Sequence, residues 1–194
     1  DLQPAESPKD IRTFYFYDGH GRRIGEVDGE RYLTEHAYDA DGRLVKTLRY
    51  LQPVAGTLTT LDAARPLAGA PQMQATYGYD ALGRLVAQVD LHGTVTRNVY
   101  DTAGNLRSTT RAWNTAEART DAARHDLLGR VIEELAPEHH ALIRATMTDA
   151  EKEAVWAQYA TRHTYDAAGR RTATTDPLGR RTVFYYEADG ALGY

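Results

Sequence analysis

The chain has 194 residues, a formal net charge of −4 and no cysteine. This length suffices for one domain or for several repeat units stacked in a row. The lack of cysteine excludes disulfides, thiolate metal sites and a cysteine nucleophile. The mild charge, with arginines scattered among acids, lacks the basic footprint of nucleic-acid-binding proteins.

No apolar run is long enough to span a membrane, and no secretory signal opens the chain. The first residue is Asp1 rather than Met, and the last, Tyr194, follows directly on a repeat. We therefore expect this sequence to be a piece of a longer protein.

A short phrase recurs along the chain: an aromatic residue, an acid, two variable residues, a glycine, a basic or polar residue and usually an aliphatic one. Its aromatic position, acid and glycine are Tyr17, Asp18 and Gly21; Tyr38, Asp39 and Gly42; Tyr79, Asp80 and Gly83; Tyr100, Asp101 and Gly104; His125, Asp126 and Gly129; Tyr165, Asp166 and Gly169; Tyr186 and Gly190, with Glu187 as the acid. Three pairs of phrases are 21 residues apart, those starting at Tyr17 and Tyr38, Tyr79 and Tyr100, and Tyr165 and Tyr186. A fixed period indicates repeated supersecondary units.

Each phrase predicts the turn of a β-hairpin. Strand-favouring residues precede it, and side chains two apart on a strand share a face, so the phrase tyrosines and the residues two before them form a row. The acid is placed to accept hydrogen bonds from backbone amides ahead of it, and the glycine to supply the positive φ that closes a type I turn into the returning strand. A second, weaker turn between paired phrases makes the pattern a meander of short antiparallel strands.

In chain order, this pattern predicts hairpin repeats interrupted by insertions, which we call excursions. An N-terminal extension at 1–10 precedes hairpins at 11–52. An insertion with a short helix near 61–65 occupies 53–72, and hairpins follow at 73–113. A short helical insertion is expected at 114–124 and a hairpin at 125–136. A helical insertion at 137–161 precedes the final, truncated hairpins at 162–194.

The clearest predicted helix lies in the last excursion. Thr148 and Glu151 fit a capping box, and Val155 and Tyr159 lie four apart on one helical face. A second short helix around 138–145 would complete a helical hairpin. The overall expectation is a mainly β fold, a meander of antiparallel hairpins forming a curved ribbon or shell segment, with short α-helical insertions.

The phrase Tyr-Asp-x-x-Gly-Arg-Leu, together with Asp-Pro-Leu-Gly-Arg-Arg-Thr at 176–182, resembles the YD repeat of the RHS-repeat family. That family includes polymorphic toxins, cocoon-forming subunits of toxin complexes and teneurins. The resemblance covers roughly residues 11–192 and implies a segment of a hollow β-shell that encloses a toxin or displays another domain. The sequence departs from it in its long excursions and in showing no autoprotease signature and no toxin domain.

The recurrent acids could be taken for catalytic groups, but a catalytic pair is built once, whereas every turn needs its acid. The segment starting at Asp39 resembles a calcium loop only at its start, because position twelve is Tyr50 instead of the bidentate Glu. His139 and His140 are adjacent and diverge by about 100° on a helix, so they do not suit one metal ion. His36, His125 and His163 fit better as substitutes for tyrosine in the row.

We therefore expect a non-enzymatic structural segment, with no cofactor and no metal site, in a secreted or surface-exposed bacterial protein. Its expected partners are the remaining repeats of the parent protein and an enclosed toxin or effector domain, with no nucleic acid and no membrane insertion. The alternative is an adhesin-type surface that binds a glycan or a protein through exposed aromatic faces or the helical insertions. Buried tyrosine rows favour the wall, and an exposed aromatic stripe would favour the adhesin.

Overall fold

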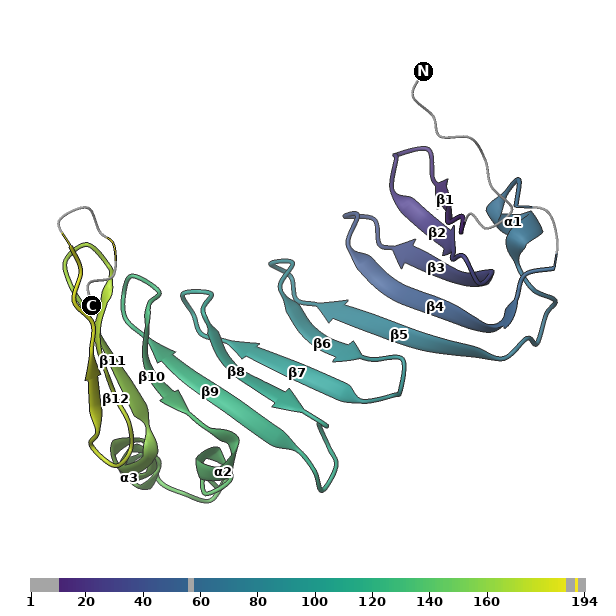
Figure 1. The fold of residues 1–194 in the computed structure, drawn as a ribbon. Coiled ribbons are helices and arrows are strands. Elements are labelled where there is room, and N and C mark those ends of the chain that lie inside the picture. The colour runs from purple at the N-terminus through teal and green to yellow at the C-terminus, as the bar shows by residue number, and fades with distance from the viewer. Residues whose placement is uncertain (1–10, 56–57, 188–190, 192–194) are drawn as a thin grey trace. The chain divides into compact units, whose positions relative to one another are not determined.

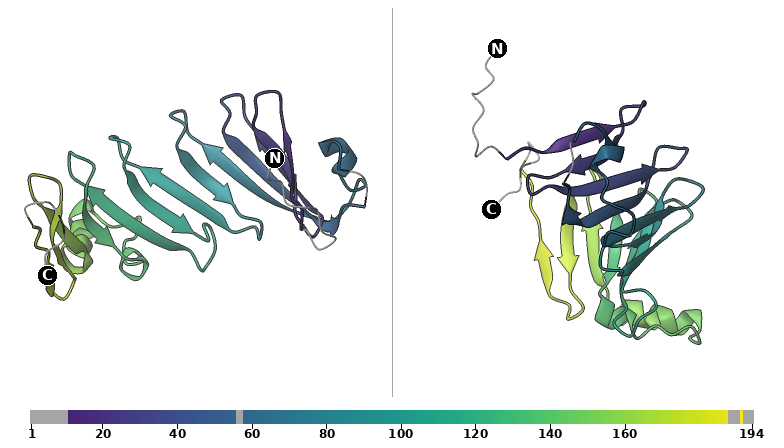
Figure 2. Two further views of the ribbon diagram at one scale, coloured as in Figure 1. Left: turned by 45° about the horizontal axis from the view of Figure 1, so that its top comes forward. Right: turned by 90° about the vertical axis from the view of Figure 1, so that its right-hand side faces the viewer.

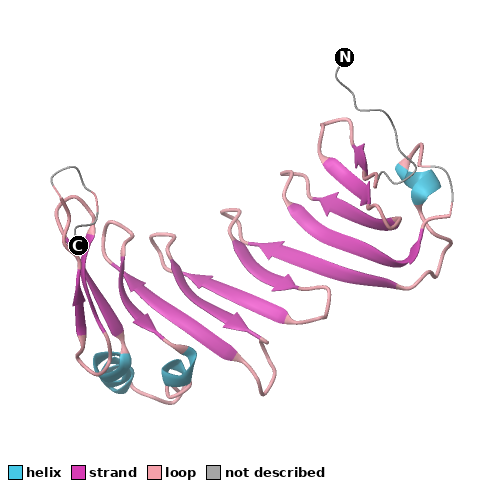
Figure 3. Cartoon of the chain, in the orientation of Figure 1, coloured by secondary structure: helices cyan, strands magenta, loops and turns pink. Residues whose placement is uncertain are grey.

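The computed structural model describes residues 11–55, 58–187 and 191, so the expected N-terminal extension and Gly190 lie outside the described residues. The chain forms two compact units, one up to Thr94 and one from Val95 onward. Thirteen strands and three short helices lie within the described part (Figure 3). None of these helices is long and apolar enough to cross a membrane.

The first unit contains six strands and one helical turn. They are β1 (Phe14–Tyr17), β2 (Arg23–Val27), β3 (Tyr32–Tyr38), β4 (Leu44–Pro53), α1 (Leu61–Ala64), β5 (Gln72–Tyr79) and β6 (Leu85–Val89). Each strand pairs antiparallel with the next in the chain. The strands consequently lie side by side in sequence order, with the phrase turns along one edge (Figure 1).

The second unit contains seven strands and two helices. They are β7 (Val95–Tyr100), β8 (Leu106–Arg111), β9 (Arg119–His125), β10 (Val131–Leu135), α2 (Pro137–His140), α3 (Asp149–Tyr159), β11 (Thr161–Tyr165), β12 (Arg171–Thr175) and β13 (Arg181–Val183). These strands also pair antiparallel in chain order. The fold class expected from the sequence, an antiparallel hairpin meander with short helices, is confirmed.

Each of the six phrase hairpins that the structure describes carries a register shift beside its aromatic residue. In β3 and β4, Ala37 pairs with Lys46 while Tyr38 pairs with Leu44, which leaves Val45 as an extra residue. The other phrase hairpins show the same shift. Such a bulge bends its strand and strengthens the local twist, so each repeat adds its own bend to the sheet.

The cores lie beneath the excursions and not along the aromatic row. In the first unit Val27, Leu33, Tyr50 and Val54 are buried with Ala64 of α1. In the second unit α3 packs on the sheet, and Ala122, Leu135, Val155, Trp156 and Ala160 are buried together. The excursions therefore supply apolar contacts that a single sheet layer lacks.

The aromatic row itself is only partly covered. Tyr38, Tyr79, Tyr100, Tyr165 and Tyr186 are half-buried. On β1, by contrast, Phe14, Tyr15 and Tyr17 are 38%, 50% and 59% exposed. The row contributes contacts between hairpins, but it does not form the main core.

The helix expected at 114–124 is wrong, because Arg119–His125 forms strand β9. Positive φ angles at Ala112 and Asn114 turn the chain before this strand, and Thr110 of β8 pairs with Thr120. Pairing with β8 and burial of Ala122 outweigh the helix propensity of the alanines.

The excursion at 137–161 contains two helices, but α2 is a single turn, Pro137–His140, rather than a helix over 138–145. Helix α3 begins at the expected capping box, in which Thr148 and Glu151 satisfy each other's backbone amides. Both helices lie next to each other beside the strands of the second unit (Figure 2).

The turn glycines allow a clean test of backbone strain. Gly169 has a φ of +82° and an added Cβ would meet nothing within 4 Å, whereas Gly19 has equally open space without a left-handed φ. We expect Gly169→Ala to lower the free energy of unfolding by about 1–2 kcal/mol, because an L-residue resists this conformation. Gly19→Ala, the matched control, should change it by less than about 0.5 kcal/mol. Urea unfolding followed by circular dichroism measures both, and equal effects would contradict the strain argument.

Candidate functional site

In the six phrases whose acid is aspartate, one carboxylate closes the turn. In the first phrase, Oδ1 of Asp18 accepts hydrogen bonds from the backbone amides of His20 (2.9 Å) and Arg22 (3.0 Å). Its Oδ2 accepts from Nε of Arg22 at 2.7 Å. The same pattern recurs at Asp39 and Asp126 and at the weaker turn of Asp176. The carboxylate thus fixes the turn and, at the same time, holds the following arginine side chain.

This arrangement keeps the turn acids ionised. The backbone amide and the guanidinium of Arg22 lower the pKa of Asp18 to about 2. The amide of Arg84 and its side chain likewise lower the pKa of Asp80, and the Arg130 side chain and amide lower that of Asp126. A carboxylate with a depressed pKa is a weak base at neutral pH. The geometry therefore suits a structural contact better than proton transfer.

At four of the phrase turns, the arginine held by the turn lies over the tyrosine of the next phrase. The Arg22 guanidinium is 5.0 Å from the ring centre of Tyr38, whose hydroxyl donates to the backbone carbonyl of Arg23 at 2.8 Å. Arg43 lies 5.2 Å from the Tyr79 ring, and the Tyr79 hydroxyl donates to the carbonyl of Leu44 at 2.9 Å. We call this pair of contacts the Arg–Tyr link.

Two more Arg–Tyr links occur in the second unit. Arg130 and Arg170 each lie 4.8 Å from the rings of Tyr165 and Tyr186. The two hydroxyls donate to the carbonyls of Val131 and Arg171, at 2.6 and 2.8 Å. In all four links the arginine precedes the tyrosine in the chain, so the link has a fixed direction.

One step of the second unit cannot form this link. The phrase that starts at Tyr100 has Asn105 where the others have arginine, and the next phrase starts with His125 instead of tyrosine. Asn105 keeps the contact within its own turn, donating from Nδ2 to Asp101 Oδ2 at 3.0 Å. Both partners of the link are thus replaced together.

The phrase glycines that the structure describes all have left-handed φ angles. The values are +76° at Gly21, +81° at Gly42, +77° at Gly83, +94° at Gly104, +77° at Gly129 and +82° at Gly169. Each donates its backbone amide to the carbonyl of the phrase acid, as Gly42 does to Asp39 at 3.0 Å. The turn glycine and the turn acid therefore act as one unit.

Histidines of the row form polar pairs across hairpins. Nδ1 of His36 lies 3.3 Å from Thr47 Oγ1, and Nδ1 of His163 lies 3.0 Å from Thr174 Oγ1. His163 also contacts Glu134 at 3.1 Å through Nε2. Burial lowers the pKa of His36. Nowhere in the described ranges do three or more histidine, aspartate or glutamate side chains gather as a metal site.

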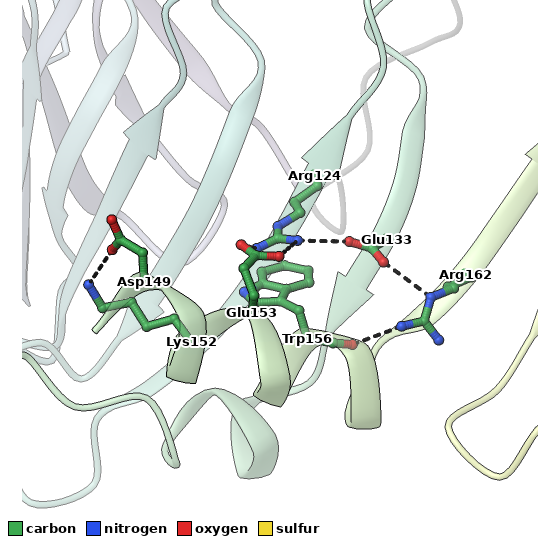
Figure 4. Close-up of polar contacts among 7 residues, drawn as sticks. All are labelled: Arg124, Glu133, Asp149, Lys152, Glu153, Trp156 and Arg162. Atoms are coloured by element: carbon green, nitrogen blue, oxygen red, sulfur yellow. Dashed lines mark hydrogen bonds and ion pairs between the residues drawn. The ribbon is translucent and has the colours of Figure 1, made fainter. Parts of the chain in front are cut away.

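Arg124 anchors helix α3 to the sheet. Its guanidinium lies 4.2 Å from the Trp156 ring, and its Nη1 donates to Glu153 at 2.9 Å and to Glu133 at 3.1 Å (Figure 4). Arg162 extends this network, donating to Glu133 at 3.1 Å and to the Trp156 carbonyl at 3.1 Å. Sequence reasoning missed this cluster, because bonded members such as Arg124 and Glu153 are 29 residues apart.

A groove of about 550 Å³ lies between α3 and the sheet, lined by Ser108, Ala122, Arg124, Ile143, Lys152 and Trp156 among others. Two of its charged side chains are paired with neighbours, Lys152 with Asp149 and Arg124 with Glu153.

The turn carboxylates predict acid sensitivity. The folded pKa of Asp18 is about 2 against an ordinary value of 3.8, so its stabilising contribution is present above about pH 4 and is lost as the pH falls towards 2. We expect Tm to fall over this window. The Asp18→Asn side chain keeps an oxygen that accepts from the backbone amides but cannot titrate. The Tm of this variant should therefore fall slightly less steeply with decreasing pH. Thermal melts between pH 5 and pH 2 measure the change of Tm with pH. An equal slope of Tm against pH in the variant and the parent would contradict the role of the Asp18 carboxylate.

The anchor of α3 can be tested with a paired control. Arg124→Ala should lower the free energy of unfolding by about 1–2 kcal/mol, since it removes a cation–π contact and two ion pairs. Arg124→Lys should recover only part of this, because an ammonium lacks the planar fork. Arg111→Ala removes an exposed pair with Asp121 and should cost less than about 0.5 kcal/mol. Equal losses for Arg124→Ala and Arg111→Ala in urea unfolding would refute the anchor.

Comparison with known proteins supports the interpretation of the repeats. The RHS repeat family model matches residues 145–181 and 165–192. No curated protein sequence matches the chain.

Solved structures with the same fold come from Tc toxins. The crystal structure of TcdB2-TccC3-Cdc42 is similar with a TM-score of 0.63 and 15% identity, over 96% of this chain and 9% of that one. TcdB2-TccC3 gives a TM-score of 0.64, 14% identity and the same coverage. A mutant Tc holotoxin pore from Photorhabdus luminescens gives 0.61 and 15%, over 93% of this chain and 8% of that one. This chain spans less than a tenth of those structures, and its likeness to them shows the fold. The match to the RHS repeat family model lies within residues 145–192.

Proposed function

We propose that this chain is a stretch of β wall in a larger secreted or cell-surface bacterial protein, where it joins further repeats and encloses or displays a toxin or effector domain. Its role is mechanical and non-enzymatic. The observation that carries the proposal is the recurrent Arg–Tyr link. In it, an arginine covers the tyrosine ring of the next phrase, and the tyrosine hydroxyl donates to a backbone carbonyl of the neighbouring hairpin. Side chains used in this way hold a sheet together.

The sheet edges support the same function. Within the described residues β1 pairs only with β2, and β13 only with β12. A strand with one neighbour presents unpaired backbone groups that accept another strand. RHS repeats in the chain and the shared fold with Tc toxin structures agree with a wall that extends on both sides.

The adhesin alternative is not favoured, because exposed aromatic side chains do not continue along the row. Those of β1 are exposed, whereas the phrase tyrosines of the later strands are half-buried under arginines. A glycan-binding platform needs several exposed rings on one face.

The enclosure can be tested by limited proteolysis of the full natural polypeptide that contains this segment. We expect its effector domain to resist cleavage in buffer and to become cleavable at a denaturant concentration that opens the wall. Tyr79→Leu, which removes one Arg–Tyr link, should lower that concentration. Leu82→Ala, at a turn apex where the side chain is 77% exposed, is the control and should leave it unchanged.

Cleavage of the effector domain at the same rate with and without denaturant would refute enclosure. Glycan-array binding that disappears on replacing Tyr15 and Tyr17 would favour the adhesin instead.

A further inference from the structure

Tyr17 is the one phrase tyrosine of the first unit that has no arginine on its ring within the described part of the chain. Its side chain is 59% exposed, while Tyr38 and Tyr79 are half-buried beneath Arg22 and Arg43. No hydrogen bond from its hydroxyl to a described residue is present, whereas each linked tyrosine donates to a backbone carbonyl. Tyr17 thus has the tyrosine half of an Arg–Tyr link without the arginine half.

The direction of the link specifies where the missing half comes from. In all four links the arginine belongs to the preceding phrase, and the accepting carbonyl belongs to the residue after that arginine. The partner of Tyr17 must therefore lie on the open side of β1, where β1 has no described neighbour. On the same strand Phe14 is 38% and Tyr15 50% exposed, and the Arg23 guanidinium lies 5.7 Å from the Tyr15 ring centre.

We propose that the open edge of β1 is a selective docking surface for a hairpin of the same repeat class whose phrase ends in arginine. The incoming strand pairs with β1, its arginine covers the Tyr17 ring, and the carbonyl of its next residue accepts the Tyr17 hydroxyl. This inference deepens the proposed wall function, on which it rests, by stating which hairpin the edge accepts.

The unlinked step in the second unit supports this selectivity. There the phrase with Asn105 in place of arginine is followed by a phrase that starts with His125 in place of tyrosine. The step that lacks the arginine therefore also lacks the tyrosine ring that the arginine would cover. Tyrosine at position 17 instead of histidine consequently specifies an arginine in the hairpin that covers it. A hairpin ending in asparagine or alanine would leave the ring uncovered and the edge weakly bound.

The surface can be tested with the full chain and a peptide hairpin. The probe is a cyclised peptide with the sequence of residues 161–176, the hairpin that presents Arg170 to Tyr186 in this chain. Cyclisation restricts the unbound peptide and so lowers the ordering cost of binding. Isothermal titration calorimetry measures its Kd for the chain and for the Tyr17→Leu variant.

We expect saturable binding that weakens on the order of five-fold or more when Arg170 of the peptide is replaced by Gln or when Tyr17 is replaced by Leu. Combining both changes should weaken it little further, because each removes the same link. Tyr185→Leu is the matched control, since Tyr185 is 71% exposed and follows β13 in the second unit. It should leave Kd unchanged, and circular dichroism verifies that both variants are folded.

Equal binding of the Arg and Gln peptides, an equal effect of Tyr185→Leu, or no saturable binding would each overturn the proposal. Failure here is distinguishable from failure of the wall function. The effector domain of the full natural polypeptide can resist proteolysis even though the peptide binds equally well with and without Arg170. That combination would refute the proposed selectivity for arginine and leave the wall function standing.

Discussion

The structure depends on a carboxylate that does two things at once. Asp39 closes its turn by accepting two backbone amides and, with its other oxygen, fixes the side chain of Arg43 at 2.8 Å. An exposed ion pair alone is worth little, because two flexible side chains must be ordered to form it. Here the turn already orders the aspartate, and the arginine is then aimed at the tyrosine of the next hairpin. Local turn chemistry is thereby converted into a contact between repeats.

Much of this could be predicted from the sequence, since it rests on local spacing. The interval from Asp39 to Gly42 is set by the turn itself, and alternation along the strands follows from backbone geometry. The antiparallel order of strands and the position of α3 followed from the same signals. The Arg–Tyr link was not predicted, although both residues stand in the phrase, because it joins Arg43 to a ring 36 positions further on. Only the register of β4 against β5 brings them together.

The errors have the same origin. The alanine content of residues 114–124 favours a helix, but pairing with β8 decides the conformation of residues 119–125. The Arg124 cluster combines a strand, a neighbouring strand and a helix, and no local period connects them. A single sheet layer leaves both faces open, so apolar cover must come from segments outside the repeat. That is why the buried cores of both units include residues of the segments inserted between the repeats.

At the step between Asn105 and His125, both partners of the Arg–Tyr link are replaced together. A tyrosine placed there without an arginine would leave a ring uncovered, and an arginine without a tyrosine would lose its partner. Replacing both residues avoids each cost and leaves the turn intact, since Asn105 still binds Asp101. The turn and the link are therefore separable: each phrase must close its own turn, but two successive phrases must agree before they can be joined by the link.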